Sequence, residues 1–331
     1  MLLRVFLRHW TRLACLLGAG SLALGCPSAR EPDGPSMPLI PRIPLPGTAL
    51  RGMSGLTAIP GTEPQEFLAV SERLHHVVPI QWTGSTFVTG TPVPVQGVPR
   101  QVDLEGIAWM DSESGASRLV FATEARTARH SDVLLEAERS GDAYHVRRQI
   151  PFDYPLWGLQ PGSNRGLEGV CAVGRGTSAR YVAVSEIVQT VNQHRRAPLG
   201  VYRVGDASWR PLWVKLTTDK GKLSGITCDE TERGWTVTAI ERHFGILRLL
   251  RFSMNDESDS ELVPEPIADL RPGFDETPPN FEGLARLDAH RLLLLTDNDY
   301  GGLQGPTELI VFESAPPAAE SSTRSRASVQ P

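Results

Sequence analysis

Acidic side chains recur at matching positions along this chain, and their spacing is the first indication of chemistry. One pattern places an acid or serine before a glycine and two small or aliphatic residues. A second pattern, 10 to 14 residues later, places a hydroxyl or aliphatic residue before an acid. The acids of the first pattern are Glu105, Glu168 and Glu282, and those of the second are Glu72, Glu124, Glu186, Glu241 and Asp297. If the fold gathers these acids, they require cations, because neighbouring carboxylates raise one another's pKa.

Two kinds of cation suit such a set, basic side chains and hard divalent ions. Calcium and magnesium both take carboxylate and carbonyl oxygens, and we predict one of them as the cofactor. The residues predicted to bind the metal are Glu72, Glu105, Glu124, Glu241, Asp297 and Asp299. The residues predicted to bind an anion are Arg73, Arg126, Arg165 and His243. The residues predicted to be catalytic are Glu168, Glu186, Arg242 and Glu282.

Two alternatives to this metal site stay open. Any single glutamate can instead be structural, accepting hydrogen bonds from backbone N–H groups of the next repeat. One loop has calcium-loop spacing, with Asp297, Asp299 and Glu308 at positions 1, 3 and 12 and Gly302 at position 6. Its flanks are strand-like, which excludes an EF-hand and leaves a calcium-binding hairpin loop or a plain turn.

The absence of several sequence motifs disfavours other kinds of active site. The chain has no Gly-x-Ser-x-Gly, which disfavours a serine hydrolase. It has no His-Glu-x-x-His and no cysteine pair with ligand spacing, which disfavours zinc. Without a phosphate-binding glycine loop, a nucleotide site is also disfavoured. We therefore predict no organic cofactor.

The elements that must position the acids are short strands. Apolar residues fall in bursts such as 66–70, 118–122, 180–184 and 292–295, bounded by turn-forming residues, and 31 Gly and 27 Pro disfavour long helices. The pattern glycines are Gly55, Gly106, Gly169, Gly225 and Gly283, giving spacings of 51, 63, 56 and 58. A period near 50 suits one four-stranded propeller blade. The sequence thus predicts an all-β fold, a β-propeller of five or six blades.

Propeller closure is predicted from the end of the domain. The last strand, within 307–313, is expected to share a blade with the first strands and so protect two open edges. The alternative is a pair of β-sandwiches with chance similarity between segments.

Several of these segments resemble a known family. They are 164–170, Ser185 with Glu186, 241–244, 279–285 and 293–299. They are similar to the phytase-like domain family, also called esterase-like activity of phytase, over roughly residues 50 to 313. The resemblance implies a β-propeller, secreted or held at the bacterial envelope, with phosphoesterase activity.

The N-terminus is typical of an exported protein. Residues 1–25 carry three arginines, no acid and a 13-residue apolar run, about 20 Å as a helix and too short for a bilayer core of about 30 Å. Residues 22–26 resemble the bacterial lipobox, so Cys26 is the predicted lipidation site. An ordinary signal peptide with an incidental cysteine is the alternative. Residues 26–45 are Pro-rich and predicted to be a tether, 46–314 the folded domain, and 315–331 a disordered tail.

The remaining composition limits the partners. Removing the three signal arginines changes the formal charge from −5 to −8, which disfavours nucleic acid as a partner, and we predict none. Cys171 and Cys228 either pair in an oxidising compartment or are two small buried side chains.

Two functions are compatible with these sequence features. One is a metal-dependent hydrolase of a small phosphorylated substrate, anchored as a monomer to the cell envelope. The other is a lipid-anchored binding or scaffold propeller whose acids are structural.

Overall fold

The chain divides into two units, Met1–Ser36 and Met37–Pro331, and the structure, a computed structural model, describes only residues of the second. The described ranges are 42–45, 51–63, 65–111, 118–127, 129–160, 165–274, 278–298 and 306–313. Asp299 and Cys26 lie outside them. In the described ranges no helix is long and apolar enough to cross a membrane.

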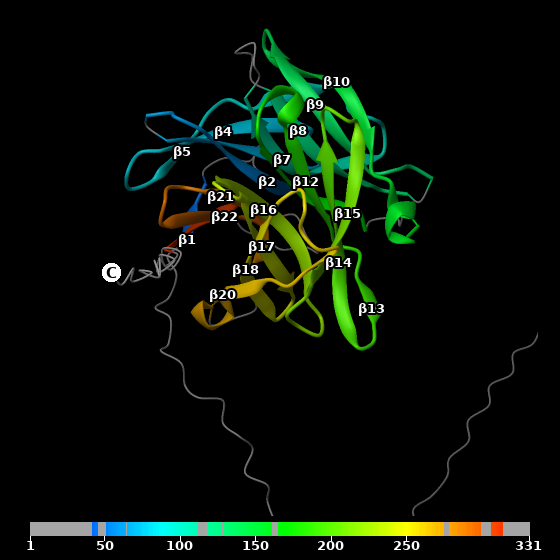
Figure 1. Cartoon of the computed structure of the whole chain (residues 1–331). Helices are drawn as coiled ribbons and strands as arrows, with labels where there is room; N and C mark the ends of the chain where they lie inside the picture. The colour runs from blue at the N-terminus through cyan, green and yellow to red at the C-terminus, as the bar shows by residue number, and fades with distance from the viewer. Residues whose placement is uncertain are drawn as a thin grey trace, which may run out of the picture. The chain divides into compact units, whose positions relative to one another are not determined.

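The described residues of the second unit form five blades (Figure 1). Blade 1 consists of β2 (Met53–Ile59), β3 (Glu66–Ser71), β4 (His76–Trp82), β5 (Phe87–Thr89) and β6 (Val93–Gln96). Blade 2 consists of β7 (Val102–Met110), β8 (Arg118–Ala125), β9 (Val133–Ser140) and β10 (Ala143–Pro151). Blade 3 consists of β11 (Leu167–Val173), β12 (Arg180–Ser185), β13 (Gln189–Val191), β14 (His194–Arg203), β15 (Ser208–Lys215) and the added β19 (Glu261–Leu262).

The last two blades complete the set. Blade 4 consists of β16 (Lys222–Thr231), β17 (Gly234–His243), β18 (Ile246–Met254) and β20 (Glu265–Asp269). Blade 5 consists of β21 (Asn280–Arg286), β22 (Arg291–Asp297), β23 (Glu308–Glu313) and β1 (Arg42–Pro44). Three short 3-10 helices connect strands: η1 (Tyr154–Trp157), η2 (Gly176–Ser178) and η3 (Arg271–Gly273).

The inner strands of the blades close into a ring. Strands β2, β7, β11, β16 and β21 contact one another in this order, and β21 returns to contact β2. Two strand pairings are parallel. The pairing of β6 with β10 links blades 1 and 2, and the pairing of β15 with β19 extends blade 3. The prediction of an all-β propeller is confirmed, with five blades, and the alternative of two sandwiches is excluded.

The last strand, β23, shares a blade with the first strand of the domain, as predicted. That first strand, β1, begins earlier in the chain than expected. Strand β1 pairs antiparallel with β23, with Arg42 opposite Ile310 and Pro44 opposite Glu308. This pairing covers an edge that would otherwise be open. Because β1 lies inside the range predicted to be a tether, the folded domain extends at least to Arg42, ahead of the boundary expected at residue 46.

The repeated glycines allow the inner strands to approach one another. Each pattern glycine follows or lies in a β-bulge of its inner strand. A Cβ at Gly225 would lie 2.1 Å from the carbonyl oxygen of Glu282 on the next blade, and one at Gly106 would lie 2.8 Å from the amide nitrogen of Val170. Only glycine tolerates such backbone contact. The bulge also turns the preceding acid or serine out of the strand pairing.

The core is divided between the blades. Five hydrophobic clusters each lie between two neighbouring blades. Because these blades are covered on both faces, their strands are continuous apolar runs, as in β22, whose Leu292 to Leu295 are all fully buried. Each such leucine contributes roughly 1.5 to 3 kcal/mol. Between blades 3 and 4 a disulfide joins Cys171 to Cys228, with Cα atoms 5.7 Å apart, which decides the alternative left open by the sequence.

Candidate functional site

The repeated acids gather at one end of the ring. Strand pairing places Val102 opposite Ala125, Lys222 opposite Arg242 and Asn280 opposite Asp297. The five inner strands therefore begin where the second strands of the blades end. We call this end of the ring the acidic end.

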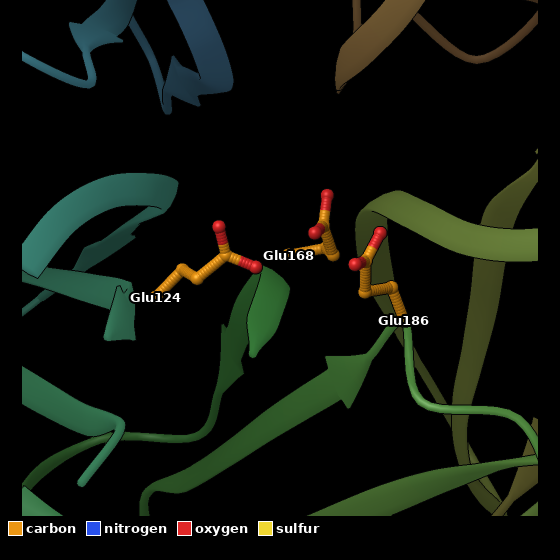
Figure 2. Close-up of side chains that lie close together, drawn as sticks. All are labelled: Glu124, Glu168 and Glu186. Atoms are coloured by element: carbon orange, nitrogen blue, oxygen red, sulfur yellow. The ribbon is translucent and has the colours of Figure 1, made fainter. Parts of the chain in front are cut away.

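Three carboxylates come closest together at the acidic end. Oxygens of Glu124, Glu168 and Glu186 all lie within 4.8 Å of one another. They come from the end of β8, the bulge of β11 and the residue after β12, and Figure 2 shows Glu168 between the other two. Glu124 and Glu168 are each 7% exposed. We call these three residues the carboxylate triplet.

Burial and mutual repulsion raise the pKa values of several acids near the triplet. Burial, and then the charge of Glu168, raise the pKa of Glu124 to about 8, against the opposing effect of a hydrogen bond from the Gly166 amide. Burial likewise raises the pKa of Glu282 to about 8. Burial and the charges of Glu168 and Glu282 raise the pKa of Glu105 well above its ordinary value. The site thus carries more acid than its own cations neutralise.

Two basic side chains enter this acidic end from blade 4. Lys222 forms an ion pair with Glu186, and Arg242 forms one with Glu282 and lies 3.7 Å from Glu168. Burial lowers the pKa of Lys222. The Nε of Arg242 is buried with no hydrogen-bond partner among the described residues. Both cations therefore border the triplet, and one retains an unused donor.

A known protein family matches most of this chain. A family model described as esterase-like activity of phytase matches residues 48–300. The chain belongs to the phytase-like family. No curated protein matches it. The family membership predicted from the sequence is confirmed.

Solved structures resemble this phytase-like chain in fold. The GH43_1 enzyme from Xanthomonas citri complexed with xylotriose is 9% identical with a TM-score of 0.52, covering 83% of this chain and 90% of that one. The PQQ-bound aldose sugar dehydrogenase from Streptomyces coelicolor is 13% identical with a TM-score of 0.50, covering 83% and 97%. At these identities the likeness concerns the fold alone.

One predicted metal ligand of the phytase-like domain is held by other residues. Both oxygens of Glu241 accept hydrogen bonds from Thr217 and Thr218, the backbone amides at 3.1 and 3.0 Å and the hydroxyls at 2.5 Å each. This carboxylate is fully buried. The structural alternative therefore describes Glu241 best, and the geometry does not support its role as a metal ligand. The pattern serines behave similarly, since Ser54 and Ser224 donate to the carbonyls of Leu104 and Phe281.

The other predicted metal ligands lie around the triplet. Glu72 forms an ion pair with Arg73 at 2.9 Å. Asn280 donates to Glu282 at 2.8 Å and to Asp297 at 3.2 Å. Glu105 is only 6% exposed and lies among other acids, with Glu168, Glu282 and Glu72 close enough to raise its pKa.

The possible calcium loop is only partly visible, because Asp299 lies outside the described residues. At its far end, Glu308 forms an ion pair with Arg42 at 3.4 Å. The calcium-loop interpretation stays a prediction.

Most of the predicted anion-binding residues either form an ion pair with an acid or are exposed. Arg73 pairs with Glu72, and Arg126 pairs with Asp103 through a bidentate contact. Arg165 is exposed. Desolvation, followed by nearby Lys222, lowers the pKa of His243. Among the predicted catalytic residues, Glu168, Glu186, Arg242 and Glu282 do come together.

Sequence reasoning missed a third repeated position. Two residues before each pattern acid or serine stand Gly52, Asp103, Gly166, Lys222 and Asn280. Each makes a contact at the acidic end through its backbone or side chain. This position varies in residue type, so it carries no compositional signal. Its fixed offset from the glycine was the signal that could have found it.

Proposed function

We propose that this phytase-like propeller hydrolyses a small phosphorylated substrate with a divalent cation, calcium or magnesium, held by the carboxylate triplet. The observation that carries the proposal is the convergence of Glu124, Glu168 and Glu186 beside the cations Lys222 and Arg242. Family membership supports a phosphoesterase, and the acidic end supplies residues suited to it.

The triplet fits a hard cation. Two oxygens bound at about 2.4 Å to one calcium ion lie at most about 4.8 Å apart, and the triplet oxygens are within 4.8 Å of one another. Burial and the charge of Glu168 raise the pKa of Glu124 to about 8, and a bound cation would favour the ionised carboxylate again. The cation would also polarise a phosphoryl oxygen.

The surrounding residues divide the remaining roles. Arg242 and Lys222 would orient the phosphate, and the unused Nε donor of Arg242 gives it a contact that its ion pairs leave free. Burial raises the pKa of Glu282 to about 8 against the opposing charge of Arg242, so Glu282 is the acid that would protonate the departing alcohol. Hydrolysis then breaks the phosphorus–oxygen ester bond, adds water to phosphorus and releases the protonated alcohol and phosphate.

The proposed location is the bacterial envelope, reached through a lipid at Cys26. The signal-like N-terminus and the Pro-rich stretch behind it motivate this proposal. The Cys171–Cys228 disulfide supports an oxidising compartment. Mass spectrometry of the mature N-terminus tests it, with a diacylglyceryl-modified Cys26 expected and an unmodified or uncleaved N-terminus contradicting it.

One observation favours the alternative of a non-enzymatic binding propeller. Lys222, Arg242, Arg73 and Arg126 all form ion pairs with acids, so an incoming phosphate competes with carboxylates. If the acids are structural, envelope extracts should yield one stoichiometric partner and no turnover.

A substrate panel separates the two functions. Purified full-length mature protein is treated with EDTA and assayed on aryl, sugar and inositol phosphates with and without calcium or magnesium. The proposal expects turnover that depends on the cation and is lost in Glu168→Gln while the melting temperature is kept. No turnover on any ester with either cation contradicts it.

A further inference from the structure

A buried tyrosine bridges the two strand ends that carry the outer members of the triplet. The Tyr154 hydroxyl donates to the Asp132 carboxylate at 2.5 Å, and the Ser185 side chain lies beside the same hydroxyl. Ser185 directly precedes Glu186. On the other side, Asp132 accepts the backbone amide of Ala125 at 2.7 Å, and Ala125 directly follows Glu124.

The hydrogen-bonded pair of Tyr154 and Asp132 lies in the protein interior, and its surroundings are tightly connected. Tyr154 is fully buried and Asp132 is 1% exposed. Tyr154 begins η1, in the connection between blades 2 and 3, and this connection is fastened by hydrogen bonds from Phe152 N to Asp132 O and from Trp157 Nε1 to Leu212 O. The Phe152 and Trp157 rings stack with centroids 4.6 Å apart. In the sequence, the segments that precede the inner strands of the other blades contain no tyrosine.

A second link runs between the same two glutamates through Gly166. Its amide donates to the Glu124 carboxylate at 2.9 Å, and its carbonyl accepts the Glu186 amide at 3.1 Å. Gly166 lies directly against Asp132, since a Cβ there would be 2.7 Å from an Asp132 carboxylate oxygen. The position of Asp132 therefore sets the position of Gly166, and with it both glutamates.

We propose that Tyr154 and Asp132 form a positioning unit that holds Glu124 and Glu186 at the separation a divalent cation requires. The inference rests on the cation site of the proposed function. Neither residue touches the cation or substrate. They act through Ala125, Ser185 and Gly166. Residues that orient metal ligands in this way change affinity by about 10- to 100-fold when altered.

Calorimetric titration of calcium into EDTA-treated full-length mature protein tests the unit. Tyr154→Phe removes only the hydroxyl and should weaken calcium binding about 10-fold or more. The matched control is Tyr181→Phe. Tyr181 is also fully buried between blades 2 and 3, and its hydroxyl donates to Glu136 at 3.0 Å, but it lies four residues before Ser185 at the far part of β12. Both variants should lose similar thermal stability, while only Tyr154→Phe loses calcium affinity.

A second pair of variants keeps the test decisive if Tyr154→Phe folds poorly. Asp132→Asn can still accept from Ala125 and hydrogen-bond to Tyr154, so it should retain most of the affinity, whereas Asp132→Ala should lose it. Equal calcium affinity in wild type, Tyr154→Phe and Asp132→Ala overturns the inference. A wild type that binds no calcium or magnesium overturns it together with the cation site. A wild type that binds calcium but hydrolyses no ester overturns the proposed activity alone.

Discussion

Glu186 and Glu241 occupy the same repeat position in neighbouring blades, yet their surroundings differ. The connection before β16 wraps Glu241 with four hydrogen bonds from Thr217 and Thr218. Glu186 instead meets Lys222, Glu124 and Glu168. A repeat therefore determines where a carboxylate points, while the adjacent connection determines whether it is satisfied internally or left for a ligand.

Replacing the central acid of the triplet should have the largest effect. Glu168→Gln keeps the side-chain shape but removes the charge between Glu124 and Glu186. Because altering residues that merely orient metal ligands already costs about 10- to 100-fold, we expect kcat/KM to fall by more than about 100-fold. Steady-state assays with excess calcium measure this effect. Activity within a few-fold of wild type would place the site elsewhere.

Replacing the internally satisfied acid should affect stability instead. Glu241→Ala leaves four half-buried donors of Thr217 and Thr218 without their carboxylate partner, so we expect the free energy of unfolding to fall by about 3 kcal/mol. Urea denaturation measures this loss. The activity per folded molecule should stay unchanged, and a large loss of kcat with little loss of stability would show that Glu241 belongs with the triplet.

The cation-free protein should lose stability as the pH rises. Glu124 and Glu282 each have a folded-state pKa raised to about 8 from an ordinary value of 4.5. The folded state therefore binds more protons than the unfolded state between these values. The stabilisation is fully present below about pH 4.5 and is lost as the pH rises through 8.

This pH effect is measurable as a difference between two denaturation curves. Between pH 7 and pH 8 we expect these two groups together to lower the free energy of unfolding by about 2 kcal/mol. Saturating calcium should restore most of the loss, and Glu124→Gln should reduce the slope. A cation-free protein whose stability is unchanged or rises over this range would contradict the raised pKa values.

The smallest predicted effect concerns the cation beside Glu186. Lys222→Gln removes a positive charge that competes with a divalent ion and contacts the substrate phosphate. We expect calcium binding to tighten and KM to rise about 10-fold, equivalent to about 1.4 kcal/mol. Titration and kinetics on one preparation measure both changes. A variant in which both constants stay at wild-type values would remove Lys222 from the site.

Much of this architecture could be predicted from the sequence, because a propeller repeats its physical constraints. Gly106 and Gly225 lie where backbones of adjacent blades touch, so their spacing revealed the blades. The gathering of the acids at one end followed from the same repeat. The strand at Arg42 was missed because a three-residue edge strand in a Pro-rich stretch has no periodic signal.

The parts that could not be predicted depend on contacts between segments far apart in the chain. Whether the Glu241 carboxylate is hydrogen-bonded within the protein depends on the conformation of the connection that contains Thr217 and Thr218. The hydrogen bond to Asp132 depends on where Tyr154 packs. The pairing of Cys171 with Cys228 required the register of two neighbouring inner strands. None of these is encoded in the repeat itself.

Calcium titration of wild type, Glu168→Gln and Glu241→Gln tests whether the carboxylate triplet, and not Glu241, holds a cation. Each full-length mature protein is freed of metal with EDTA and titrated in the calorimeter under the same conditions, with folding verified by melting temperature. We expect one saturable ion in the wild type, retained in Glu241→Gln and lost in Glu168→Gln. Absence of binding to the wild type, or equal binding to both variants, would contradict it.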